Sequence, residues 1–425
     1  MSRVVHTTRL LVGVLGFSVA LLSAADASAQ GAARWFSAWT VSHNARQTMP
    51  ALSNSTVRMI VRPTIAGGSV RVKLEHTLGQ APATFSSVFI GVADQGASVV
   101  PGTNRKLTFN GLADLTLAPG AGAWSDPVAF VVHAFQRLSV SVDVASASDI
   151  SAHTLGLVTN YQAPGSRAAD VSATGFTAVP PGGNVPGFPF YWLAAVDVMS
   201  SSSSGTIVAF GDSITDGRCS TNESDAVIPD RYQRWTDVLA ARLASRPGSE
   251  VMGVVNAGIA GNRIAPPGGN GPAGLARLDR DALERAGATH VILFEGTNDI
   301  AGGATAAQVI AGMQQIIERV HAKGLSIIGV TIIARGRPES MMGWNAEMEA
   351  QRLAVNTWIR TQRNFDGVID FDPLMKGGPV HAGSQSLAPE FNCGDYTHPN
   401  PAGYKAMGES IDLGLFRAVS GAPQR

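Results

Sequence analysis

Charged side chains are scarce in this chain of 425 residues, and neither sign dominates. Only 15% of the residues are charged, and 32 Lys and Arg are balanced by 32 Asp and Glu, so the formal net charge is zero. No basic stripe follows the pattern that tracks a phosphate backbone, so we expect no nucleic-acid partner. At 45% hydrophobic residues, the chain is nevertheless too apolar to be disordered.

Metal-binding and dinucleotide-binding patterns are also missing. The sequence contains no H-E-x-x-H and no paired C-x-x-C, so we expect neither a metal nor another cofactor. The stretch Gly269–Gly274 fits G-x-G-x-x-G, but it does not follow a strand directly and contains Pro272. It therefore does not predict a dinucleotide site.

Long apolar runs are confined to the amino terminus. Positive residues precede an apolar run from Leu10 to Leu22, and Ala27-Ser28-Ala29 follows as a small-residue cleavage site. This order predicts a secretory signal peptide over residues 1–29, since the run is short for a membrane anchor. We therefore expect a secreted protein, extracellular or periplasmic, without stable membrane insertion.

Residues 30–204 show the two-residue period of half-buried strands. In "RLSVSVDVA", apolar residues from Leu138 to Val144 alternate with Ser139, Ser141 and Asp143. Strands of this kind bury one face and expose the other, as in antiparallel sheets. We predict an all-β sandwich, jelly-roll-like, that ends in the strand "FYWLAAVDV" and a serine-rich linker, Ser200–Ser204.

Residues 205–425 change to apolar strands that alternate with amphipathic helices. The predicted strands are Thr206–Phe210, Val251–Val255, His290–Phe294, Ser326–Ile333 and Val368–Phe371. The predicted helices lie in 234–246, 306–324 and 344–358 and after Pro401. This alternation predicts a flavodoxin-like three-layer αβα domain with five parallel strands, whose ligands bind at the carboxyl ends of the strands.

A serine stands at one of those strand ends. In "IVAFGDSITDG" a buried strand runs into Gly211 and Asp212, and Ser213 follows. A serine hydroxyl needs a base within hydrogen-bond reach and an acid that orients the base. Of the nine histidines, His398 fits best, because it lies past the last strand with Asp395 three residues before it.

Two further strand ends offer donors for an oxyanion. "NAGIAGNRI" follows the second strand and "FEGTNDI" follows the third, so both reach the edge that carries Ser213. Gly261 can present a backbone N–H and Asn298 a side-chain amide, which are the usual donors to an oxyanion.

Four ordered blocks now resemble the SGNH, or GDSL-like, family of esterases and lipases. They are Gly211-Asp212-Ser213, Gly261 within "GIAGN", Gly296-Thr297-Asn298-Asp299 and Asp395-Tyr396-Thr397-His398. The resemblance covers about the last 215 residues. The order of a β half and this second half also resembles, more vaguely, a secreted subgroup of the family whose amino-terminal domain is a sandwich. Ser213 does not stand in a Gly-x-Ser-x-Gly motif, which is typical of α/β-hydrolases.

The resemblance implies a role for each of these residues. Ser213 is expected to be the nucleophile, His398 the base and Asp395 the acid that orients it. The backbone N–H groups of Ser213 and Gly261, with the Asn298 amide, are expected to form the oxyanion hole. Gly258 is the alternative to Gly261. The stretch 334–344, "ARGRPESMMGW", matches no block of the family.

The sequence contains only two cysteines, Cys219 and Cys393. If the expected triad assembles, both cysteines come near it. We therefore predict a disulfide that joins the nucleophile loop to the Asp-His loop; two separate buried thiols are the alternative.

These features predict a secreted serine esterase that hydrolyses carboxylic esters through an acyl-enzyme on Ser213. A carbohydrate ester, small or polysaccharide, is one expected substrate class. An O-acetyltransferase, a short-chain lipase or lysophospholipase, and a non-catalytic glycan-binding protein are the alternatives. The oligomeric state stays open.

Overall fold

The computed structural model of the chain describes residues 1, 32–47, 52–179, 188–223, 226–246, 251–267, 269–337, 343–361, 363–380 and 384–417. Apart from Met1, the predicted signal peptide lies outside the described residues. No helix within the described ranges is long and apolar enough to span a membrane.

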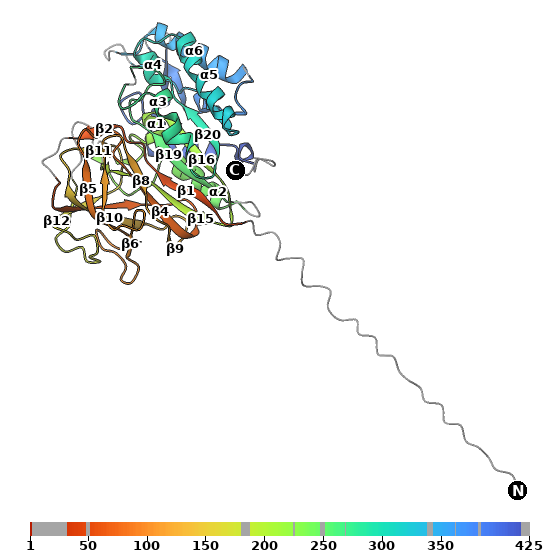
Figure 1. Ribbon diagram of the computed structural model, residues 1–425. Helices are drawn as coiled ribbons and strands as arrows, with labels where there is room; N and C mark the ends of the chain where they lie inside the picture. The colour runs from red at the N-terminus through yellow and green to blue at the C-terminus, as the bar shows by residue number, and fades with distance from the viewer. Residues whose placement is uncertain are drawn as a thin grey trace. The chain divides into compact units, whose positions relative to one another are not determined.

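The amino-terminal half consists of antiparallel sheets (Figure 1, red to yellow). The first sheet has the order β1 (Arg34–Thr40), β15 (Leu193–Ser200), β4 (Gly67–Glu75) and β8 (Gly122–Trp124), with β9 (Val128–Val132) also on β4. The second has the order β13 (Thr177–Ala178), β12 (Tyr161–Pro164), β3 (Ser55–Val61), β10 (Leu138–Ser146), β5 (Ala83–Val92) and β6 (Arg105–Leu107), with β7 (Leu115–Leu117) also on β5. A small third sheet joins β14 (Phe190–Tyr191), β11 (Ile150–His153) and β2 (Ala45–Gln47).

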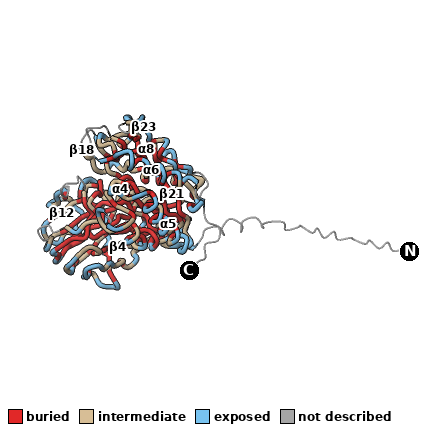
Figure 2. Tube along the Cα trace, turned by 90° about the horizontal axis from the view of Figure 1, so that it is seen from above, coloured by how far each residue is buried: buried red, intermediate tan, exposed pale blue. Residues whose placement is uncertain are grey.

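One apolar core lies between the two larger sheets. Val70 and Val72 of β4 belong to the same buried cluster as Val140 and Val142 of β10. These residues are the alternate positions of their strands, so each sheet turns one apolar face inward. The predicted all-β half is thus confirmed, and Figure 2 shows its strands as largely buried.

The outer face of β10 differs from the prediction. Ser139, Ser141 and Asp143 were expected to face solvent, but they are only 1%, 1% and 5% exposed. Asp143 accepts hydrogen bonds from the backbone N–H groups of Arg167 and Ala168, both at 2.9 Å. The loop that contains these residues covers the sheet, and polar side chains tolerate the burial because they are hydrogen-bonded.

The carboxyl-terminal half is built on five parallel strands, as predicted. They are β16 (Ser203–Gly211), β19 (Val251–Gly258), β20 (Ala288–Phe294), β21 (Ser326–Val330) and β22 (Gly367–Ile369). Their spatial order is β19-β16-β20-β21-β22, which is the flavodoxin-like order 2-1-3-4-5. The first strand therefore lies inside the sheet, between two neighbours that also end at the ligand-binding edge.

Helices cover both faces of this sheet. Val208 and Phe210 of β16 share a core with α3 (Gly274–Leu278), α5 (Ala306–Ala322) and α6 (Ala346–Thr361). Ile207 and Ala209, which point to the opposite face, share a core with α2 (Trp235–Ala244), α7 (Phe371–Met375) and α8 (Pro401–Ser410). A strand that is buried on both faces needs an unbroken apolar run, and this accounts for "IVAF".

Shorter elements complete this half. They are the helical turns α1 (Ser213–Asp216), η1 (Asp279–Leu283), α4 (Thr297–Ala301), η3 (Pro389–Phe391) and η4 (Leu413–Leu415), and the ribbons β17 (Asn222–Glu223) with β18 (Ala226–Val227) and β23 (Lys376–Pro379) with β24 (Gln385–Leu387).

Four details of the element boundaries differ from the prediction. The strand expected over 190–198 is divided into β14 and β15 at Trp192, whose φ is +56°. β21 ends at Val330 rather than Ile333, and Phe371 begins α7 instead of ending a strand. The serine run is not a linker over its length, because β16 already begins at Ser203 and residues 33–425 form one compact unit.

Candidate active site

Ser213 lies where β16 turns sharply into α1. A Cβ on Gly211 would lie 2.6 Å from the carbonyl oxygen of Phe294, so the turn requires glycine. Asp212 then caps α1, since its Oδ1 accepts the N–H of Ile214 at 2.9 Å. Ser213 thus becomes the first helical residue at the carboxyl end of the strand and is 4% exposed.

His398 and Asp395 meet Ser213 from the loop before α8. His398 Nε2 lies 2.8 Å from Ser213 Oγ, across 185 residues of sequence. The other ring nitrogen, Nδ1, lies 2.5 Å from Asp395 Oδ2. Asp395 Oδ1 also accepts the backbone N–H groups of Thr397 and His398, both at 2.9 Å, so the carboxylate is fixed in its own turn. The three predicted residues are therefore brought together in the order that base catalysis on a serine requires.

The charges of this trio are set by burial and by one another. Burial alone would raise the pKa of Asp395, but the hydrogen bond from His398 and the adjacent N–H groups hold it well below its ordinary value. Burial lowers the pKa of His398; Asp395 opposes this, and the charges of Arg218 and Arg335 add to it. The arrangement favours an ionised carboxylate beside a neutral imidazole that can accept a proton.

Two of the three candidate oxyanion donors, Asn298 and Gly261, lie on α4 and on the loop that follows β19. Asn298 is in the first turn of α4, and its Nδ2 donates to the carbonyl oxygen of Asn262 at 3.0 Å. Asp299 accepts the N–H of Ile264 at 3.0 Å, so α4 is bonded twice to the loop that follows β19. Gly261 lies in that loop with φ +77°, a conformation that favours glycine.

The structure distinguishes between the two glycines. The N–H of Gly258 donates to Asn256 Oδ1 at 2.8 Å and is therefore already engaged. A Cβ on Gly258 would lie 2.2 Å from the backbone nitrogen of Asp216, so this glycine serves the close packing of β19 against α1. Gly261 stays the candidate donor.

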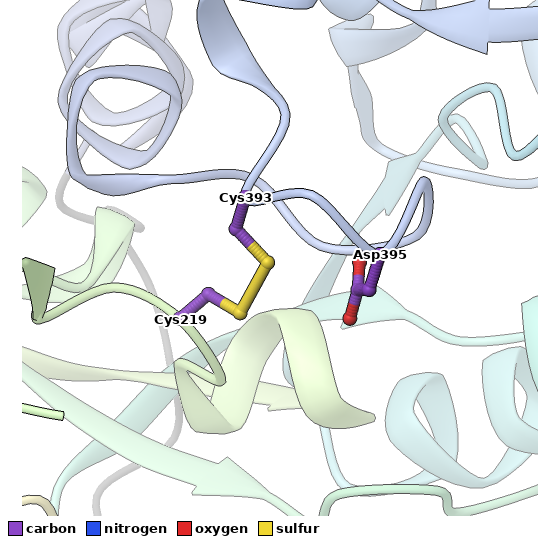
Figure 3. Close-up of side chains that lie close together, drawn as sticks. All are labelled: Cys219, Cys393 and Asp395. Atoms are coloured by element: carbon purple, nitrogen blue, oxygen red, sulfur yellow. A yellow bond between two sulfur atoms is a disulfide. The ribbon is translucent and has the colours of Figure 1, made fainter. Parts of the chain in front are cut away.

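The cysteines form the predicted disulfide. Cys219 and Cys393 are bonded, with Cα atoms 6.3 Å apart, and the bond lies beside Asp395 (Figure 3). The three side chains also have the spacing of a metal-ligand group. Because the two sulfurs are bonded to each other, neither is a thiolate that could bind a metal. The disulfide joins the loop after α1 to the loop that carries His398.

Arg277 is a central residue that the sequence did not reveal. Its guanidinium is 1% exposed and donates to the carbonyl oxygens of Ala257 at 2.7 Å and Gly211 at 2.9 Å. It also donates to Asn262 Oδ1 at 2.9 Å and contacts Glu295 Oε1 at 3.2 Å. Arg277 thus joins the ends of three strands and the Gly261 loop, although no motif in "GLARLDRD" marks it.

His153 is a second such residue, and it comes from the sandwich. Its Nε2 lies 3.0 Å from Asp216 Oδ1 at the end of α1, and its Nδ1 contacts the carbonyl oxygen of Ser42 at 2.7 Å. Asp216 Oδ2 accepts the N–H of Ala260, next to Gly261, at 2.8 Å. Burial alone would lower the pKa of His153, but Asp216 outweighs it and raises the pKa. A sandwich residue therefore contacts Asp216 at the end of α1, and Asp216 in turn is hydrogen-bonded to the loop that contains Gly261.

The carboxyl-terminal half is similar to known lipases and acylhydrolases. Residues 209–406 match the model of the GDSL-like Lipase/Acylhydrolase family. No curated protein matches the chain. A lipase/acylhydrolase from Enterococcus faecalis shares 23% identity over 48% of this chain and 92% of its own, with a TM-score of 0.35. A GDSL-like lipase from Bacteroides thetaiotaomicron shares 17% identity over 50% of this chain and 88% of its own, at 0.37. A carbohydrate acetylesterase family member from Sinorhizobium meliloti shares 17% identity over 48% of this chain and 94% of its own, with a TM-score of 0.37.

Proposed function

Because residues 209–406 form a GDSL-like lipase/acylhydrolase domain, we propose that the protein is a secreted serine esterase that hydrolyses carboxylic esters through an acyl-enzyme on Ser213. One observation carries the proposal: the alignment of Ser213 Oγ, the His398 imidazole and the Asp395 carboxylate at the edge of the sheet. The Cys219–Cys393 disulfide and the signal-peptide pattern support export, since disulfides persist in oxidising compartments.

The reaction follows from these contacts. As Ser213 Oγ bonds to the ester carbonyl carbon, its proton passes to His398 Nε2, and the carbonyl oxygen becomes an oxyanion. When the tetrahedral intermediate collapses, the bond to the alcohol oxygen breaks and that oxygen takes the proton from His398. Water then repeats the sequence on the acyl-enzyme and releases the acid. Asp395 keeps Nδ1 protonated and stabilises the imidazolium throughout.

A fluorophosphonate tests the proposal without any substitution. We expect one phosphonyl group per chain, found by mass spectrometry on the peptide that contains Ser213, and a parallel loss of 4-nitrophenyl acetate hydrolysis. Labelling of another residue, or full labelling with unchanged hydrolysis, would place the reaction elsewhere.

The Asn298→Ala variant is expected to lose about 10²–10³-fold in kcat, because one donor to the oxyanion is removed. KM should change little, since the oxyanion exists only beyond the ground state. Steady-state hydrolysis of 4-nitrophenyl acetate measures both constants. An unchanged kcat would exclude Asn298 as a donor, and a rise in KM alone would assign it to substrate binding.

The pH profile should report the lowered pKa of His398. Only the neutral imidazole accepts the serine proton, so kcat/KM is expected to rise with pH and to reach half its plateau below pH 6.5, the ordinary pKa of histidine. Initial rates under limiting substrate across the acid range give the midpoint. A midpoint above that value would contradict the proposed environment of the base.

A further inference from the structure

Two guanidinium groups flank the candidate triad from the segment after β21. Arg335 Nη1 donates to Thr297 Oγ1 at 3.4 Å, and Arg337 Nη2 donates to Thr397 Oγ1 at 3.0 Å. Each threonine immediately precedes a candidate site residue, the oxyanion donor in one case and the base in the other. Arg335 and Arg337, which belong to the stretch that matched no block of the family, thus lie beside the candidate site residues.

Both positive charges lack a carboxylate of their own. Within the described part of the chain, neither Arg335 nor Arg337 forms an ion pair, and their side-chain bonds go to hydroxyls. The nearby Asp395 is engaged by His398 at 2.5 Å. Burial and the charge of Arg337 lower the pKa of Arg335, and the charges of Asp212 and Asp395 offset this only in part. Two partly buried like charges are costly unless an anion pairs with them.

Arg335 is nevertheless held in place. Its guanidinium carbon lies 5.6 Å from the ring centroid of Trp344, so the aromatic face supports the charge without neutralising it. Trp344 is itself fixed, because its Nε1 donates to Glu349 Oε2 at 3.1 Å. Glu349 in turn pairs with Arg352 at 2.6 Å, so this carboxylate is also engaged.

The position of Arg335 and Arg337 relative to the base His398 indicates which part of an ester they would contact. The departing alcohol must lie beside His398 Nε2, because that nitrogen returns the proton to it. Resting on the esterase function proposed above, we propose that the leaving alcohol of the natural ester carries an anionic group, a carboxylate or a phosphate, and that Arg335 and Arg337 bind it. Guanidinium groups suit both anions because they donate in a planar fork.

A matched pair of acetyl esters tests the charge alone. 4-Acetoxybenzoate carries a carboxylate on the leaving group, and 4-acetoxybenzamide is its neutral counterpart. We expect kcat/KM to favour the benzoate by about tenfold, a ratio that falls as salt screens the charges. In the Arg335→Gln/Arg337→Gln variant the ratio should fall to about one, whatever the change in the benzamide rate itself. Because both rates come from one protein preparation, a folding defect would lower them together and leave the ratio unchanged.

Charge-matched controls sharpen the result. The Arg105→Gln variant removes an exposed arginine of β6, whose side chain donates to the carbonyl oxygens of Gly102 and Asn104, and should keep the wild-type ratio. An Arg335→Lys/Arg337→Lys variant should keep part of the preference. A wild-type ratio near one, or a preference that survives both glutamine substitutions, would overturn the proposal.

Calorimetry separates this inference from the esterase function. If neither ester is hydrolysed, the proposed function fails, but binding of 4-hydroxybenzoate and 4-hydroxybenzamide to wild-type protein still decides the anion site. Stronger binding of the benzoate, lost in the double glutamine variant, supports the anion site; equal binding overturns it.

The two sources of anion are then compared with an O-acetylated methyl glucuronoside and an O-acetylglycerol phosphate. Each is set against its uncharged analogue: preference for the first favours an acidic sugar, and preference for the second a phosphoglyceride.

Discussion

Replacing Ser213 by alanine is expected to lower kcat for ester hydrolysis by about 10⁶-fold, because the attacking oxygen is removed. Replacing His398 by alanine should cost about as much, since the hydroxyl then has no base within reach. The two losses should not add in the double variant, because both residues serve one proton transfer. Asp395→Asn keeps the geometry but disturbs the tautomer of the imidazole, so we expect a loss of about 10⁴-fold there.

A serine nearby provides the matched control. Ser220 is buried in the loop after α1, and its hydroxyl has no hydrogen-bond partner among the described residues. Ser220→Ala removes the same oxygen atom close to the site and should leave kcat essentially unchanged. Hydrolysis of 4-nitrophenyl acetate, normalised to folded protein by circular dichroism, measures all the variants. A Ser213→Ala rate within about tenfold of wild type would refute the assignment of the nucleophile.

The second large effect is expected at Arg277, and it concerns stability as well as rate. Arg277→Met leaves the carbonyl oxygens of Gly211 and Ala257 without their donor and Glu295 as an unpaired buried acid. Breaking a buried ion pair from one side costs about 3–5 kcal/mol in the free energy of unfolding. Because the same guanidinium fixes Asn262 next to the proposed donor Gly261, kcat should fall even where the variant is fully folded.

Denaturant unfolding followed by circular dichroism measures this cost. Glu295→Gln added to Arg277→Met should recover part of the stability, because the uncompensated acid is removed. Arg167→Met, which breaks an exposed pair with Asp170, is the control and should cost about 0–1 kcal/mol. Equal losses at Arg167 and Arg277 would show that the buried guanidinium does not hold the strand ends together.

The sequence was sufficient to predict the parallel sheet and the proximity of Ser213, Asp395 and His398, because the signals were local and repeated. An apolar run such as "IVAF" is typical of a strand that is buried on both faces, and the ends of parallel strands meet at one edge. Ser213 and Asn298 could therefore be placed near each other from their strands alone. Asp395 and His398 lie three residues apart, so one turn was enough to pair them.

Residues that act across the fold gave no such signal. Arg277, His153 and Arg335 are single polar residues with ordinary neighbours in the sequence, and their partners come from distant elements. For the same reason Asp143 was expected at the surface, since nothing in its strand indicates the loop that covers it. Periodicity predicts which face of a strand is apolar, but not what lies over the other face.

The contact between His153 and Asp216 has a consequence for how the chain unfolds. The Asp216 carboxylate at the end of α1 has its partner, His153, in β11, a strand of the other half. If the sandwich opened first, Asp216 would stay buried without its cation, and the catalytic half would be destabilised at once. Melting of the two halves should therefore be coupled in a single cooperative transition. A truncated chain that begins at β16 would contain all three residues of the candidate triad but would lack the His153 contact that stabilises Asp216.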